Sequence, residues 1–285
     1  MASKPELDSS MLLAVCEYLY ENRILERMSP TRFQARNRNE FRAMLRCMYA
    51  SFAYGQPLGA LDKLLTGQWK YGRDVVRDGK YDAMASADLT SLFSYGFSAS
   101  VLRTTGARSV LDLGCGTGGF LDYLRDHGFS GALYGLDLSE DAIDEGVRHG
   151  AEARGVELRV GDLFDVAGFR SVIQEGKLDV LSLMFVLHEF EDDAVMDMLR
   201  RIGREFPGTG VLLTELPARS SDEIRNARRT VFPELKFVHE ISGQILRTRD
   251  QWKDLFERSG FTLRAERANE LTNQLCMFFA SIEST

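Results

Sequence analysis

Two of the four histidines stand where a chain can do chemistry. His188 follows the apolar run LSLMFVL, and His239 lies in a long segment further along the chain. An imidazole accepts a proton near neutral pH and also binds metals. Glu189 adds a carboxylate, and two imidazoles with one carboxylate leave positions open for a chelating substrate. His188, Glu189 and His239 are therefore the candidate catalytic residues. The letters HEFED do not continue as HExxH, which excludes a zincin.

A glycine-rich run, VLDLGCGTGG at 110–119, joins a predicted strand to a predicted helix. Its turn is tight, and a ligand that approaches the backbone there needs residues without a Cβ, such as Gly114, Gly116 and Gly118. The same run also satisfies the GxGxxG dinucleotide pattern. The loop alone does not decide between cofactors.

Three acidic residues at the ends of predicted strands narrow the choice of cofactor. Asp112 precedes the first glycine of the loop, where its carboxylate can face a ligand amine. Asp137 ends the second strand, where an acid binds ribose hydroxyls. Asp162 ends the third strand and can accept a hydrogen bond from an adenine amino group. The remaining residues of the predicted cofactor site are Leu138, Gly161 and Leu163.

With these motifs, residues 105–285 resemble the class I S-adenosylmethionine-dependent methyltransferases. The resemblance implies an enzyme with a Rossmann-like sheet. It also implies that Asp137 holds the ribose, Asp162 the adenine end and the Gly114–Gly118 loop the methionine part of S-adenosyl-L-methionine.

The run LHEF around His188, together with His239, resembles the α-keto acid C-methyltransferases of amino-acid-derived natural products, which include the 2-ketoarginine methyltransferases of antibiotic biosynthesis. The resemblance implies a metal (Fe, Zn, Co or Ni) on His188, Glu189 and His239, and 5-guanidino-2-oxopentanoate as the substrate. Carbon 3 of a 2-keto acid is nucleophilic only after enolisation, which a chelated metal promotes as a Lewis acid. Arg73 is a candidate for binding the substrate carboxylate.

Other functions remain open. In a metal-free small-molecule O-methyltransferase, His239 would be the base for a substrate hydroxyl, and His188 would belong to the general methyltransferase pattern. A non-catalytic cofactor-binding partner of another enzyme is the second alternative, although the intact strand-end acids speak against it. The group that removes the C3 proton is also open, among Glu189, His239 and a metal-bound hydroxide.

The elements that position these residues alternate after residue 105. Strand-like runs at 109–113, 132–138, 157–163, 179–185 and 210–216 are separated by helical patterns near 118–127, 140–149, 166–175 and 190–204. This alternation predicts an α/β fold with a parallel sheet. Residues 262–268 and 274–281 predict an antiparallel C-terminal hairpin. Thr248 and Gln251 fit a capping box.

Two further segments complete the predicted organisation. Residues 1–104 show mainly helical patterns, and we expect them to form a cap and a homodimer contact. Residues 217–247 form an insert between the fifth strand and the next helix. A connection of that length is usually functional, and we expect it to close the active site.

Composition limits the class of partner. The 285 residues include 42 acidic and 35 basic side chains, with a net charge of -7, which argues against binding to nucleic acid. No apolar run approaches the ~20 residues of a membrane span, and the first residues lack the layout of a signal peptide. The four cysteines form no CxxC pair. We expect a cytoplasmic enzyme with a small-molecule substrate.

Overall fold

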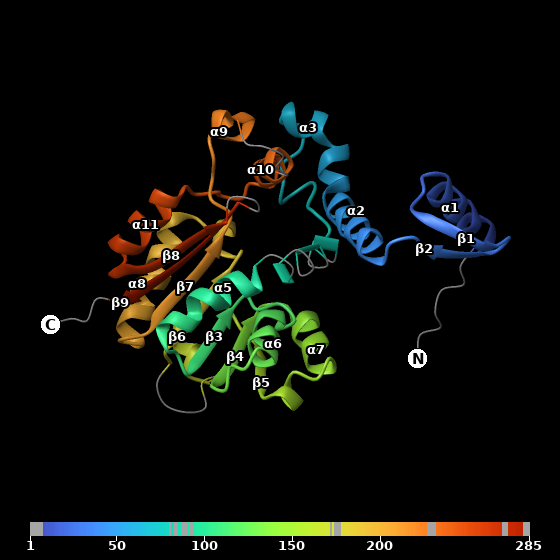
Figure 1. The fold of residues 1–285 in the computed structure, drawn as a ribbon. Coiled ribbons are helices and arrows are strands. Elements are labelled where there is room, and N and C mark those ends of the chain that lie inside the picture. The colour runs from blue at the N-terminus through green and yellow to red at the C-terminus, as the bar shows by residue number, and fades with distance from the viewer. Residues whose placement is uncertain are drawn as a thin grey trace.

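The computed structural model describes residues 8–79, 81–82, 85–86, 90–91, 94–171, 173, 178–226, 232–269 and 273–281. A seven-stranded sheet flanked by helices forms its centre, and a smaller N-terminal unit stands apart from it (Figure 1). Within these residues, no helix has the length and apolar character needed to cross a membrane.

The central sheet has the strand order β5-β4-β3-β6-β7-β9-β8. Its parallel strands are β3 (Ser109–Leu113), β4 (Ala132–Asp137), β5 (Val156–Val160), β6 (Val180–Met184) and β7 (Gly210–Glu215). The antiparallel strands β8 (Phe261–Asn269) and β9 (Gln274–Ser281) confirm the predicted hairpin. The strand order reverses between β3 and β6. In open α/β sheets, ligands bind at the carboxyl ends of the strands beside such a reversal.

Helices cover both faces of the sheet (Figure 1). On one face lie α5 (Tyr95–Leu102), α6 (Gly119–Asp126) and α7 (Glu140–Arg148), and on the other lie α8 (Asp192–Glu205) and α11 (Arg249–Arg258). Every residue of β3 is buried, as a strand covered on both sides requires. The capping box of Thr248 and Gln251 opens α11 as predicted.

The helical segment predicted near 166–175 begins as a 3-10 helix, not an α-helix, and residues 172, 174 and 175 lie outside the described residues. The chain forms a 3-10 helix, η3 (Val166–Ser171), in which the Gly168 N–H bonds to the Asp165 carbonyl at 2.9 Å. The Asp165 carboxylate also accepts from the Gly168 N–H, so this local side-chain bond competes with α-helical pairing.

The N-terminal region is mainly helical, as predicted, but it also contains a short hairpin that the pattern did not predict. Helix α1 (Ser9–Glu21) ends before Arg23, which has a φ of 61°. The strands β1 (Leu25–Ser29) and β2 (Arg32–Ala35) then pair as a hairpin, before α2 (Arg38–Gly59) and α3 (Leu61–Leu65). The apolar residues at 24–25 continue the spacing of α1, which explains why the hairpin was not predicted. Dimerisation through this region stays a prediction.

The long insert after β7 contains two helices, α9 (Ser221–Asn226) and α10 (Phe232–Ile241). Both begin beyond the carboxyl end of β7, so they lie at the edge of the sheet where ligands bind (Figure 1).

Candidate active site

The glycine loop after β3 has backbone conformations that favour glycine, and it is open to a ligand at Gly116. Gly114 has a φ of 71°, and a Cβ there would lie 2.9 Å from Val186 Cγ2. Gly116 has a φ of 57°, and a Cβ there would meet no atom within 4 Å. These positive φ angles favour glycine. The open side of Gly116 leaves room for a ligand to reach the backbone.

Asp137 holds this loop in place from the end of β4. One carboxylate oxygen accepts from the Gly116 N–H at 2.8 Å, and the other accepts from the Ser139 N–H at 2.8 Å. Asp162 lies just after the neighbouring strand β5, where it accepts from the Phe164 N–H at 2.8 Å. The predicted ribose and adenine acids therefore follow adjacent strands.

The other predicted cofactor residues follow the same strand ends. Leu138 is 76% exposed, so an apolar side chain is open to a ligand beside Asp137. Gly161 and Leu163 are half-buried on either side of Asp162.

Asp112 is a buried carboxyl group with unused hydrogen-bonding capacity. Its residue is 3% exposed, and among the described residues its Oδ1 has no hydrogen-bond partner. Burial raises the pKa of Asp112 to about 7; the Ser182 hydroxyl lowers this pKa and the charge of Asp137 raises it. A buried acceptor beside the loop fits a cationic group of a ligand, such as an amine.

His188 and Glu215 form a buried pair at the ends of neighbouring parallel strands. The chain turns after β6 through the 3-10 helix η4 (Leu187–Glu189), and Glu215 ends β7. His188 Nδ1 lies 2.8 Å from Glu215 Oε2. Glu215 Oε1 accepts from the backbone N–H groups of Leu187 at 3.0 Å and His188 at 3.3 Å. Three hydrogen bonds therefore fix the carboxylate against the imidazole.

The Glu215 carboxylate also controls the basicity of the His188 ring. Burial lowers the pKa of His188, but the charge and hydrogen bond of Glu215, together with the charge of Glu189, outweigh burial, and the net shift is upward. A carboxylate facing Nδ1 fixes the tautomer with hydrogen on that atom. The other ring nitrogen, Nε2, then carries the lone pair.

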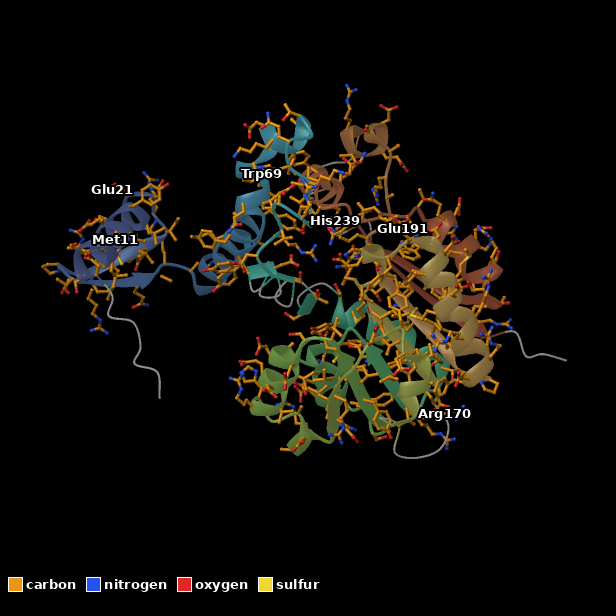
Figure 2. The ribbon with its side chains drawn as sticks, turned by 180° about the vertical axis from the view of Figure 1, so that it is seen from behind. Met11, Glu21, Trp69, Arg170, Glu191 and His239 are labelled. Carbon is orange, nitrogen blue, oxygen red and sulfur yellow. The ribbon has the colours of Figure 1, made fainter. Side chains whose placement is uncertain are left out.

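The insert brings His239 to His188, as the sequence predicted. His239 lies near the end of α10 and is 8% exposed (Figure 2). The two imidazole rings have centroids 5.2 Å apart and planes at 72°. This contact confirms that residues distant in sequence meet at one end of the sheet.

Glu189 joins this cluster but faces other partners. Its Oε1 lies 3.7 Å from His188 Nε2 and accepts from Arg77 Nη2 at 2.6 Å and from Gln244 Nε2. Burial raises the pKa of Glu189, but Arg77, Gln244 and His188 outweigh burial and lower it overall.

The predicted metal ligands are close together but are not arranged as a metal site. In the described part of the chain, no group of three or more His, Cys, Asp or Glu residues is placed to hold a metal ion. The Glu189 carboxylate accepts from Arg77 and Gln244, so the predicted third ligand is bound by other donors. This donor set does not fit the predicted metal.

The predicted substrate arginine, Arg73, lies elsewhere. Its side chain is 65% exposed and pairs with the adjacent Asp74 at 2.6 Å. Arg77, four residues later, is the arginine that contacts Glu189. The sequence did not predict the contact of Arg77 with Glu189 or that of Glu215 with His188. Glu215 could have been found because it is a single acidic residue at the end of a buried strand.

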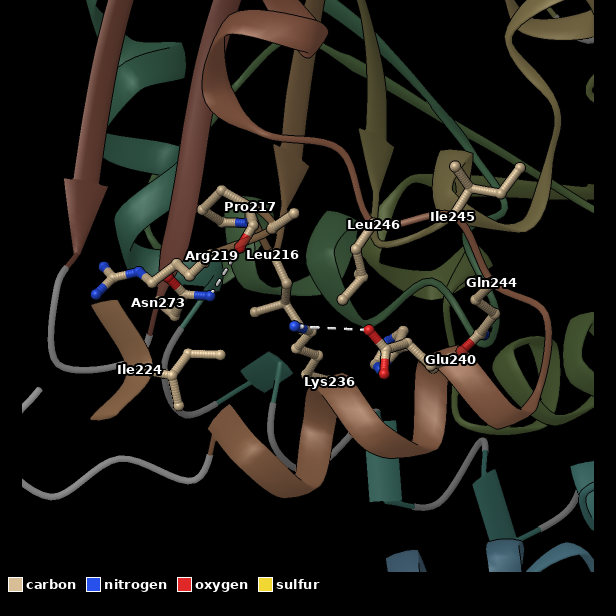
Figure 3. Close-up of a pocket in the computed structure, with 12 residues that line it drawn as sticks. Leu216, Pro217, Arg219, Ile224, Lys236, Glu240, Gln244, Ile245, Leu246 and Asn273 are labelled. Carbon is tan, nitrogen blue, oxygen red and sulfur yellow. Dashed lines mark hydrogen bonds and ion pairs between the residues drawn. The ribbon is translucent and has the colours of Figure 1, made fainter. Parts of the chain in front are cut away.

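A cavity of about 400 Å³ is lined by the residues directly after β7, by α10 and by the segment that follows α10 (Figure 3). His239 forms part of its wall, so the cavity adjoins the histidine pair. Apolar side chains line much of it, among them Leu216, Ile224 and Leu246, with Lys236 and Glu240 on α10. Its volume and lining suit a small organic molecule.

Comparisons with known proteins agree with this architecture. A methyltransferase domain family matches residues 77–266. The mitomycin biosynthesis 6-O-methyltransferase of Streptomyces lavendulae is 31% identical over 191 residues, which is 65% of this chain and 49% of that protein. Methyltransferase ungE' of Aspergillus campestris is 29% identical over 167 residues, 54% of this chain and 48% of that protein. The chain thus spans about half the length of these curated relatives.

The fold also matches solved structures. Human N-acetylserotonin methyltransferase, in complex with S-adenosylmethionine, superposes with a TM-score of 0.70 at 15% identity, over 99% of this chain and 89% of that one. With the family match over residues 77–266, the chain belongs to the methyltransferase domain family and has the fold of the class I S-adenosylmethionine-dependent enzymes.

Proposed function

We propose that this protein methylates a hydroxyl oxygen of a small-molecule acceptor, with S-adenosylmethionine as the methyl donor and His188 as the general base. The observation that carries the proposal is the buried pair of His188 and Glu215, 2.8 Å apart. The similarity to a mitomycin 6-O-methyltransferase supports the same class of reaction.

The base has the required geometry. With Nδ1–H donated to Glu215, the His188 lone pair lies on Nε2. An acceptor hydroxyl at hydrogen-bond distance from Nε2 would give its proton to that nitrogen. Glu215 would stabilise the imidazolium that forms, because its charge remains 2.8 Å from Nδ1. The raised pKa of His188 makes it a stronger base for this step.

The strand-end residues support the choice of cofactor. Asp137 and Asp162 offer carboxylates for ribose and adenine, and Gly116 offers an open backbone. The unused Oδ1 of Asp112 fits the ammonium group of a methionine portion. Bound S-adenosylmethionine supplies a sulfonium methyl group that a nucleophile can take. The acceptor oxygen forms the new C–O bond, the C–S electron pair stays on sulfur, and the proton goes to His188.

C-methylation at carbon 3 of a 2-keto acid is the second candidate function, with 5-guanidino-2-oxopentanoate as the predicted acceptor. The contact of His188 with His239, beside Glu189, favours this candidate because the keto acid resemblance rests on these residues. His188 would then remove the C3 proton. The ligand arrangement described above gives no support to metal-assisted enolisation.

One labelling experiment distinguishes these functions. The purified chain is incubated with S-adenosylmethionine carrying a CD3 methyl group and a panel of hydroxylated aromatics and 2-keto acids, with and without a strong chelator. Product fragmentation by mass spectrometry locates the label. We expect label on an acceptor oxygen, in the presence of chelator as well.

Label at carbon 3 of a keto acid would establish the second candidate. Loss of that activity with chelator, and its return with added metal, would restore the metal hypothesis. Cofactor binding without any product across the panel would favour the non-catalytic partner protein.

A further inference from the structure

We propose that Arg77 is a positioning residue that holds the Glu189 carboxylate away from the reacting nitrogen of His188. The inference rests on the proposed role of His188 as the base. Arg77 lies in the N-terminal region, between α3 and the first strand of the sheet, β3. Its role would therefore link the N-terminal region to catalysis.

The contacts of Arg77 form a fixed clamp. Its Nη2 donates to Glu189 Oε1 at 2.6 Å, and its Nε donates to Asp82 at 2.8 Å. Its backbone N–H donates to the Tyr71 hydroxyl at 3.3 Å. The side chain is 21% exposed. Asp82 and Tyr71 therefore hold the arginine, and the arginine holds Glu189.

The same Glu189 oxygen is the one nearest to the base. Oε1 lies 3.7 Å from His188 Nε2, and a movement of about 1 Å would bring it to hydrogen-bond distance. There its charge would stabilise a proton on Nε2, and the lone pair that must accept the proton of an acceptor hydroxyl would no longer be free. Gln244 also donates to Oε1, but as a neutral amide it makes a weaker bond to a carboxylate than a guanidinium does. Arg77 is thus the main restraint on this carboxylate.

A double substitution separates restraint of Glu189 from simple tethering of the N-terminal region. Both roles predict that Arg77→Gln lowers kcat. If Arg77 restrains the Glu189 charge, Glu189→Ala should rescue the variant, because no carboxylate then remains to hold a proton on Nε2. If Arg77 only tethers, removing the second partner of the same ion pair cannot restore the activity.

The experiment measures kcat and KM for an acceptor identified by the labelling panel, and the Kd of S-adenosylmethionine by calorimetry. We expect Arg77→Gln to lower kcat at least tenfold with the cofactor Kd within twofold of wild type. The Arg77→Gln/Glu189→Ala double variant should return to within threefold of Glu189→Ala alone. Arg77→Lys, which keeps a cation near Glu189, should lose less than Arg77→Gln.

The matched control is Arg258→Gln, which removes an exposed arginine paired with Asp254 on α11 and should behave as wild type. Wild-type kcat in Arg77→Gln, or a double variant as slow as Arg77→Gln, would overturn the proposal.

A second readout needs no acceptor, so failure of the proposed function stays distinguishable. Diethyl pyrocarbonate modifies a free imidazole nitrogen, and peptide mass spectrometry compares the rate at His188 with that at the exposed His149 in the same sample. We expect the relative rate at His188 to fall at least fivefold in Arg77→Gln and to recover in the double variant. An unchanged rate in Arg77→Gln would overturn the proposal whether or not any acceptor is methylated.

Discussion

The substitution Glu215→Gln removes one charge from the active site while keeping the size of the side chain. Its amide oxygen can still accept from the Leu187 and His188 backbone N–H groups that Glu215 Oε1 binds. The amide nitrogen then faces His188 Nδ1, where the native oxygen lies at 2.8 Å. Because both would be donors, the imidazole must move its hydrogen to Nε2.

This change of tautomer sets the expected magnitude. With hydrogen on Nε2, His188 has no lone pair toward the acceptor, and the contribution of the base is lost. General base catalysis is worth roughly 10²- to 10⁴-fold in kcat, or about 3–5 kcal/mol. The Kd of S-adenosylmethionine should stay within about twofold, since Glu215 contacts none of the strand-end cofactor residues. Loss of the charged hydrogen bond should lower the free energy of unfolding by about 1.5–3 kcal/mol.

The assay follows formation of S-adenosylhomocysteine at saturating acceptor, with cofactor affinity by calorimetry and unfolding by urea. Glu257→Gln, on the exposed side of α11, is the matched control and should match wild type. A Glu215→Gln enzyme with kcat within threefold of wild type would refute the assignment of His188 as a base oriented by Glu215.

Three further predictions concern the surrounding residues. Asp137→Ala should weaken S-adenosylmethionine binding by about 1.5–3 kcal/mol, since it removes a charged acceptor and releases the Gly116 N–H; unchanged affinity by calorimetry would contradict the cofactor site. The pKa of Asp112 is about 7 in the folded protein and 3.8 ordinarily, so between these values the cofactor-free fold binds one more proton than the unfolded chain. The free energy of unfolding should therefore fall as the pH rises from 4 to 7, by up to about 1.4 kcal/mol per pH unit. In Asp112→Asn this slope should be absent from urea titrations, and an unaltered slope would show that another group causes it. His239→Ala should raise the acceptor KM with little change in kcat because His239 lines the cavity; a large loss of kcat would make His239 the base instead.

The sequence predicted the sheet because its strands are short apolar runs between helical patterns, a signal carried by neighbouring residues. Predicted strands such as 109–113 and 274–281 agree with β3 and β9. The hairpin at 25–35 was missed because a tight turn interrupts a region with helical spacing. Local patterns therefore predict the type of an element correctly, except where a tight backbone turn interrupts the pattern.

Site residues were predictable where topology alone places them. Parallel strands end at one edge, so Asp137 and His188 were expected there from the order of the elements. The Glu215 contact needed two more facts, that β6 and β7 are neighbours and that the chain turns sharply after β6. The role of Arg77 could not be predicted, because its contact with Glu189 depends on how the irregular segment around Arg77 lies against the end of the sheet.

Chemical rescue of His188→Ala is the most direct test of the central claim. Single-turnover methyl transfer is measured in this variant with and without added imidazole, at saturating cofactor and acceptor. The His188 base predicts a loss of at least about 10²-fold, unchanged cofactor affinity, and partial recovery that increases with imidazole concentration. A variant that transfers methyl within a few-fold of the wild-type rate, or one that loses activity and gains none from imidazole, would contradict it.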